Sequence, residues 1–234
     1  MPVVTVSGLL GSGAREAGRM AADLLGIDYV DQQLLVDAAR RLGVPLETMA
    51  ERDERCASFG QRLAATLHNF LERSAASGGD PLLGSGGLEI LLSRSYAEMA
   101  AAKETGQEIS DATYMGTMTA IIRELGSRGD IVILGRGSQM ILKDLPGALH
   151  VLTIAPLQLC TQRYAQREGL SLKEAARRVQ EGDRGIVAFY RKFWRVDVND
   201  PWLYDLVVDT SKLSYEAAAA VVATATGAKA VAAI

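Results

Sequence analysis

The stretch VTVSGLLGSGARE, from Val4 to Glu16, holds the strongest structural signal in the chain. Its β-branched start predicts a strand over Val3–Ser7, and glycines follow before a helical segment, Ala14–Leu25, that Gly26 would close. In a strand–turn–helix of this kind, backbone N–H groups and the positive end of the helix converge on a phosphate. We therefore predict that the turn binds a phosphate or sulfate anion through Gly11, Ser12, Gly13, Ala14 and Arg15.

The turn matches only the first half of a Walker A motif. Gly8 and Gly13 have the spacing of the two glycines of that motif. Ala14 stands where the lysine belongs, and Arg15 stands where a serine or threonine would bind magnesium. A glycine turn after a strand can also be only a tight connection to the next helix. The pattern leaves both interpretations open, and it identifies no magnesium ligand.

Four further apolar segments have the composition of strands, and helical patterns separate them. They end at or span Tyr29–Val30, Ile131–Leu134, Leu149–Ile154 and Leu206–Val208. This alternation predicts an α/β fold of three layers, α/β/α, around a mostly parallel five-stranded sheet. We expect one domain over residues 1–234, in which residues 46–127 form a helical insertion without strands.

The composition excludes several classes of protein. The 234 residues carry a net charge of −3, which argues against a chain-wide surface for nucleic acid. Two cysteines, Cys56 and Cys160, suit a reducing cytoplasm, and with His68 and His150 they lack the spacing of a zinc site. The alanine-rich end, Ala217–Ile234, predicts a helix on the core rather than a membrane contact. We expect a cytoplasmic protein, and its oligomeric state stays open.

A basic segment follows the fourth predicted strand. Between Arg163 and Arg195 there are nine lysines and arginines against four acidic residues. Arg163 and Arg167 are four residues apart and share a helix face, where guanidinium groups could bind phosphate oxygens. The same charges could also form a solvated helix face. Trp194 and Trp202 flank a loop at the end of this segment, and we expect both to pack there.

The order of these segments resembles the cytidylate kinase-like family, a branch of the P-loop nucleoside monophosphate kinases. The resemblance rests on the turn at residues 11–14, on Asp31 after the second strand and on Gly135-Arg136-Gly137 after the third. It continues through LHVLTIAPLQLCTQRYAQREGLSLKEAARRV and DPWLYDLVVDTSKLS. It covers both ends of the chain and is weak in the middle.

The resemblance implies an ATP-dependent kinase of small phosphorylated acceptors such as a nucleoside monophosphate, with magnesium bound to the ATP. Arg136 and Asp31 would bind the acceptor, and residues 46–127 would form the monophosphate-binding lobe. Residues 156–200 would form a lid that closes over the triphosphate. Within this lid, Arg163, Arg167 and Arg184 would act on the transferred phosphoryl group.

Two positions depart from the family pattern. Ile186 stands where we expect a second lid arginine, and Cys160 stands where an arginine often follows the start of the helix. Loss of one such arginine can cost about a thousandfold in rate. The alternative is therefore a catalytically weak or inactive nucleotide-binding regulatory protein that keeps the kinase fold.

Overall fold

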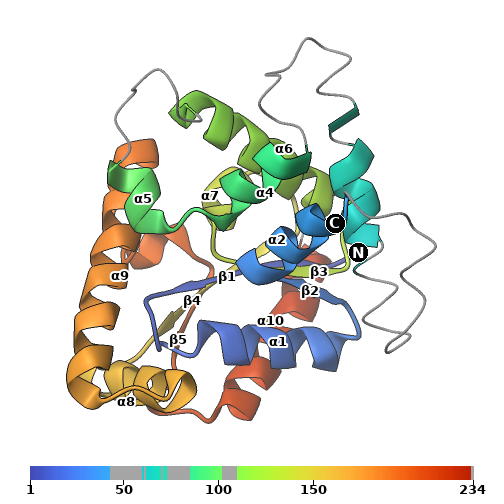
Figure 1. Ribbon diagram of the computed structural model, residues 1–234. Coiled ribbons are helices and arrows are strands. Elements are labelled where there is room, and N and C mark those ends of the chain that lie inside the picture. Colours follow the sequence, from blue (N-terminus) through green and yellow to red (C-terminus); the bar gives the residue numbers. More distant parts are fainter. Residues whose placement is uncertain (43–59, 61, 70, 73–84, 102–109, 233–234) are drawn as a thin grey trace. The chain divides into compact units, whose positions relative to one another are not determined.

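The computed structural model describes residues 1–42, 60, 62–69, 71–72, 85–101 and 110–232 (Figure 1). The chain divides into two compact units. The first unit comprises Met1–Tyr29, Ser95–Ala101 and Gly129–Ile234, and the second comprises Val30–Arg94 and Ala102–Arg128.

The sheet of the first unit has the strand order β2-β3-β1-β4-β5. Its pairings of β1 with β3, of β1 with β4 and of β4 with β5 are all parallel. Consequently the carboxyl ends of these strands lie along one edge, where ligands collect in α/β sheets. The strands are β1 (Val3–Gly8), β2 (Asp28–Val30), β3 (Ile131–Leu134), β4 (Leu149–Ile154) and β5 (Leu206–Asp209).

Helices cover both faces of this sheet. Alternate β1 side chains point to opposite faces, so each face can pack against a helix. Val6 faces Gly18 of α1 (Ala14–Leu25), whereas the Ser7 hydroxyl donates to Gln139 of α7 (Ser138–Ile141) at 3.1 Å. Helix α10 (Tyr215–Ala232) packs beside α1. The predicted three-layer α/β/α fold with a parallel sheet is confirmed.

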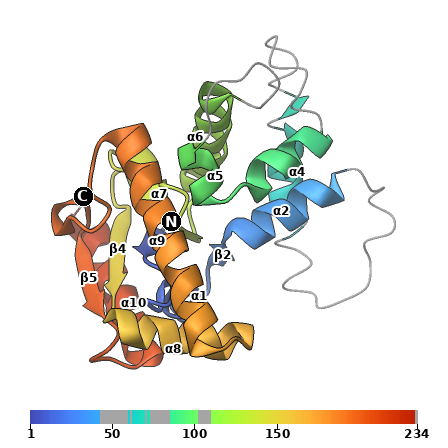
Figure 2. The same ribbon diagram turned by 60° about the vertical axis from the view of Figure 1, so that its left-hand side comes forward.

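The basic segment forms two helices, α8 (Leu157–Glu168) and α9 (Leu172–Trp194). Ser171 begins α9 by accepting a hydrogen bond from the Glu174 amide. Figure 2 shows α9 as one long helix with α8 at its N-terminal end. A short 3-10 helix, Pro201–Leu203, precedes β5, and there Trp202 is 93% exposed. The expectation that Trp202 packs is therefore wrong.

The described elements of the second unit are helical: α2 (Gln32–Arg41), α4 (Ser85–Ser93) and α6 (Asp111–Arg128). The Gln32 side-chain amide donates to the last carbonyls of α4, including that of Ser93 at 3.0 Å. Much of the predicted insertion, residues 46–127, lies outside the described residues. Within that range, α5 (Tyr96–Ala101) belongs to the first unit and packs against α9.

Among the described helices, none combines the length and the apolar character needed to cross a membrane.

Candidate functional site

The glycine-rich turn between β1 and α1 has left-handed backbone at two positions. Gly11 has a φ of 78° and Gly13 has a φ of 85°. A side chain would cost about 1–2 kcal/mol at each of these positions, whereas glycine adopts this conformation freely. The Ser12 amide donates to the Leu9 carbonyl at 3.0 Å and closes the turn.

The carbonyl groups of this turn are occupied. The Gly11 carbonyl accepts from Arg163 at 3.4 Å, the Ser12 carbonyl from Thr210 at 2.7 Å and the Gly13 carbonyl from the Ala17 amide at 2.9 Å. In the described part of the chain, the amides of Gly11, Gly13 and Ala14 have no acceptor. The turn therefore presents donors without carbonyl oxygens beside them, as an anion site requires.

Close packing fixes which residues the turn can contain. A Cβ on Gly11 would lie 2.3 Å from the Cys160 carbonyl oxygen of α8. A Cβ on Gly13 would lie 2.7 Å from the Tyr215 ring of α10. Contacts this short force the neighbouring atoms to move. The glycines are thus required by space as well as by backbone conformation.

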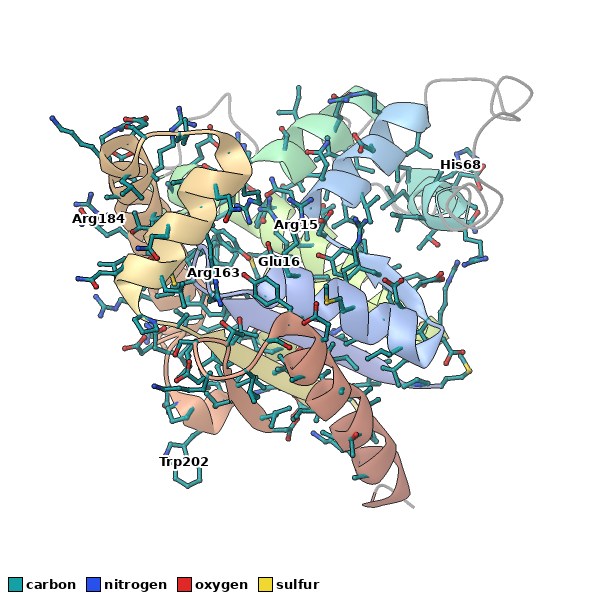
Figure 3. All side chains as sticks on the ribbon, turned by 90° about the horizontal axis from the view of Figure 1, so that it is seen from below. Arg15, Glu16, His68, Arg163, Arg184 and Trp202 are labelled. Carbon is teal, nitrogen blue, oxygen red and sulfur yellow. The ribbon has the colours of Figure 1, made fainter. Side chains whose placement is uncertain are left out.

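Two residues that depart from Walker A differ in exposure. Ala14 is buried and places no charge at the lysine position, whereas Arg15 is exposed at the start of α1 (Figure 3). The buried Ser12 hydroxyl lies 2.8 Å from that of Thr153. The described residues contain no group of three His, Cys, Asp or Glu side chains that could hold a metal ion.

A second turn follows β3 and also has left-handed backbone. Gly135, Arg136 and Gly137 have φ values of 70°, 57° and 70°. The Arg136 amide donates to the Tyr96 hydroxyl, and the Arg136 guanidinium lies 5.2 Å from the centre of the Tyr96 ring. Trp194 packs so closely that a Cβ on Gly137 would lie 2.2 Å from it. Aromatic side chains of α5 and α9 thus hold Arg136, which is 4% exposed.

A buried polar network supports the base of both turns. The Gln139 side-chain amide bonds to Ser7 at the end of β1, to Tyr190 of α9 at 2.8 Å and to Tyr204 at 3.2 Å. Burial raises the pKa of Tyr190 well above its ordinary value, so this hydroxyl stays protonated. The network connects the end of β1 with α7 and α9, and it fixes the geometry beneath the two turns.

The three predicted lid arginines have different surroundings. Arg163 is bound to Thr210 and to the turn. Arg167 forms ion pairs with Glu16 of α1 at 3.6 Å and with Glu168 at 2.8 Å. Arg184 is exposed on α9, donates to the Gln180 carbonyl of its own helix and projects away from Arg163 (Figure 3). Arg163 thus contacts the glycine-rich turn, Arg167 pairs with the first turn of α1, and Arg184 bonds within its own helix.

Helix α9 also holds the turn directly. The Asp183 carboxylate accepts from the Leu10 amide at 2.9 Å. Burial raises the pKa of Asp183, and the hydrogen bond from Leu10 opposes that rise. Ile186, at the departing lid position, is buried. A hydrophobic residue therefore packs where the resemblance leads us to expect an arginine.

Asp31, in the second unit, caps α2. Its carboxylate accepts from the Leu34 amide at 3.0 Å. Its predicted role toward the acceptor stays a prediction.

Sequence reasoning gave no role to Tyr96, Gln139 or Thr210. Thr210 stands in the DTSKLS segment, whose resemblance to the family was the one available signal. Gln139 stands in the segment IVILGRGSQMIL, which carried the same signal, whereas Tyr96 carried none.

Residues 3–212 match the model of the cytidylate kinase-like family. A cytidylate kinase of Pyrococcus horikoshii is 26% identical over 94% of this chain and 85% of its own length. One of Methanopyrus kandleri is 36% identical over 39% of this chain, and the match spans about half, 52%, of that kinase. A crystal structure from Eubacterium ventriosum, 14% identical, superposes with a TM-score of 0.58 over 97% of this chain and 98% of its own. That structure supports the fold alone.

Proposed function

The chain belongs to the cytidylate kinase-like family, and we propose that it transfers the γ-phosphoryl group of ATP to a nucleoside monophosphate, cytidylate or a close relative. The single observation that carries this proposal is the set of amides at Gly11, Gly13 and Ala14, which meet no acceptor among the described residues and lie at the carboxyl edge of a parallel sheet. An anion the size of a phosphate group is their natural partner.

The glycine-rich turn would bind the donor phosphates. Its amides and the N-terminus of α1 supply partial positive charge, and Arg15 supplies a full charge at the exposed side of the turn. These groups need no lysine at position 14 for binding, because backbone donors carry the contact. Phosphoryl transfer depends mostly on such positioning and charge neutralisation.

Arg136 would bind the acceptor phosphate. Its guanidinium is planar and forms paired hydrogen bonds with phosphate oxygens, and Tyr96 holds its backbone and its charge. A buried arginine with a left-handed backbone is costly to maintain, and such strain is found where function requires it. Asp31 remains the second predicted acceptor residue.

Arg167 and Arg184 would neutralise charge on the transferred group. Arg167 is already at the start of α1, whereas Arg184 would have to turn from its own helix. Magnesium, which neutralises charge on the triphosphate, would be held mainly by phosphate oxygens and water. The described residues that surround the turn supply no acidic cluster for it.

A turnover assay with ATP, magnesium and a panel of nucleoside monophosphates tests this function. We expect ADP formation that depends on one acceptor, with cytidylate among the best. A thermal-shift panel runs beside it, since a ligand at 100 times its Kd stabilises by about 2.7 kcal/mol. Stabilisation by ATP without transfer to any acceptor would favour the inactive nucleotide-binding alternative. Absence of both effects would contradict nucleotide binding altogether.

A further inference from the structure

The guanidinium of Arg163, on α8, is bound to a single residue of the loop between β5 and α10. Nη1 donates to the Thr210 hydroxyl at 2.8 Å, and Nη2 donates to the Thr210 carbonyl at 2.8 Å. Nη1 also reaches the Gly11 carbonyl at 3.4 Å. The guanidinium carbon lies 4.9 Å from the centre of the Tyr215 ring. This forked arrangement fixes the plane of the guanidinium.

Thr210 connects Arg163 to the glycine-rich turn. Its hydroxyl donates to the Ser12 carbonyl at 2.7 Å. A hydroxyl has one proton and two lone pairs, so the same oxygen can accept from Arg163 while it donates to Ser12. Thr210 is only 2% exposed, and an unsatisfied partner in such a place is costly because water cannot replace the lost bond.

We propose that Arg163 and Thr210 form a clamp that keeps the glycine-rich turn in its anion-binding conformation. Arg163 is then a positioning residue for the donor phosphates, which it does not touch. This inference rests on the proposed binding of ATP phosphates at the turn, and it gives Arg163 an indirect part in what Arg167 and Arg184 would do directly.

The geometry of one peptide bond explains why the clamp matters. In a trans peptide the C=O and the following N–H point in opposite directions. Because Thr210 holds the Ser12 carbonyl, the amide of Gly13 points to the other side, where no protein acceptor meets it in the described residues. Glycine at position 13 allows this peptide to flip, and a flip would turn the Ser12 carbonyl toward the anion.

Direct contact and positioning predict different results for Thr210→Val. If Arg163 touches the phosphates, removal of the hydroxyl frees its guanidinium and leaves ATP binding unchanged or tighter. If Arg163 and Thr210 act as a clamp, the same change releases the Ser12 carbonyl and weakens ATP binding. Valine keeps the shape of threonine, so the two outcomes separate the roles.

The experiment measures the Kd for ATP by calorimetry, together with amide hydrogen exchange of the peptide covering residues 9–17. We expect Thr210→Val to raise the Kd about tenfold, as for one lost buried hydrogen bond, and to speed exchange in that peptide. Thr210→Ser keeps the hydroxyl, so we expect the wild-type Kd for ATP and the wild-type exchange rate. The matched control is Thr226→Val, which removes an equally buried hydroxyl that donates to the Val222 carbonyl within α10. It leaves both measurements as in the wild type.

Arg163→Lys is the second variant, in case Thr210→Val does not fold. Lysine keeps the charge but cannot bind the same acceptors with a forked group, so ATP binding should weaken by a similar factor. The double variant that combines Arg163→Lys with Thr210→Val should show no further loss of ATP affinity. A wild-type Kd in Thr210→Val or in Arg163→Lys, or unchanged exchange in both, would overturn the clamp. If the wild type binds no ATP, the proposed function fails, and the exchange comparison still decides whether the clamp holds the turn.

Discussion

The two turns at the carboxyl edge of the sheet share left-handed backbone but present different groups. They follow neighbouring strands, β1 and β3, and the Gly135 amide donates to the Val6 carbonyl between them. The first turn leads into a 12-residue helix and offers backbone amides. The second leads into a four-residue helix and offers one side chain, that of Arg136.

This difference bears on the proposed donor site, because it makes the departures from Walker A compatible with phosphate binding at the first turn. A turn that binds through amides depends on backbone conformation, so Ala14 and Arg15 are compatible with it. A turn that binds through one guanidinium depends on the identity of that residue and on what holds it. We therefore expect substitutions in the first turn to weaken donor binding by changing its space and backbone conformation. Substitutions of Arg136 should weaken acceptor binding by removing its guanidinium.

The largest effect is expected for Arg136→Ala, which removes the only charged side chain of the second turn. The kcat/KM for the acceptor should fall by about a thousandfold, on the scale of a lost catalytic arginine, while the KM for ATP stays within a few-fold. Arg191→Ala, which removes an exposed arginine from α9, is the control. Steady-state kinetics with each substrate varied in turn would show the separation.

A smaller but still large effect is expected for Gly13→Ala. The added Cβ meets the Tyr215 ring at 2.7 Å and displaces the turn, so ATP should bind about a hundredfold more weakly. Gly26→Ala is a matched control, because Gly26 also has a positive φ, 67°, but a Cβ there meets nothing within 4 Å. Both variants lose stability, and only Gly13→Ala should lose the ATP-dependent thermal shift. Equal shifts in the two would place the donor elsewhere.

Tyr96→Phe tests how the second turn is held. Phenylalanine keeps the ring beneath the Arg136 guanidinium and removes the hydroxyl that accepts from the Arg136 amide. We expect the KM for the acceptor to rise about three- to tenfold, as for one hydrogen bond, with the Kd for ATP unchanged. A loss of ATP affinity as large as that for the acceptor would argue against this role.

The smallest effect concerns the sheet beneath both turns. His150 of β4 lies 2.7 Å from the Thr5 hydroxyl of β1, and burial lowers its pKa below the ordinary 6.5. The unfolded chain therefore binds a proton more readily. Stability is full above about pH 6.5 and falls as the pH drops through that value toward the folded pKa. Urea midpoints between pH 7.5 and 5.5 should decrease in the wild type, and decrease less in His150→Gln.

Patterns local in sequence predicted most of the fold. The β-branched run at the start of the chain, the apolar run Ile131–Leu134 and the helix Ala14–Leu25 with Gly26 at its end all appear as predicted. Each signal lies within one element, where periodicity and capping decide the structure. The prediction that Trp202 packs was wrong, because composition alone does not show which face of a turn meets the core.

The candidate site was harder to predict, because its decisive contacts join residues far apart in the chain. Arg163 and Thr210 are 47 positions apart, and Tyr96 and Arg136 are 40 apart. Spacing placed Arg163 on the same helix face as Arg167, but it could not show that Arg163 is bound to Thr210. The glycines of the turn could be predicted because the requirement for them arises from the local backbone.

The division of work between the two turns is tested most directly by calorimetric titration of ATP and of cytidylate into three proteins: the wild type, Gly13→Ala and Arg136→Ala. We expect Gly13→Ala to lose affinity for ATP and keep cytidylate, and Arg136→Ala to lose cytidylate and keep ATP. Loss of both ligands in both variants, or loss of ATP in Arg136→Ala alone, would contradict this division.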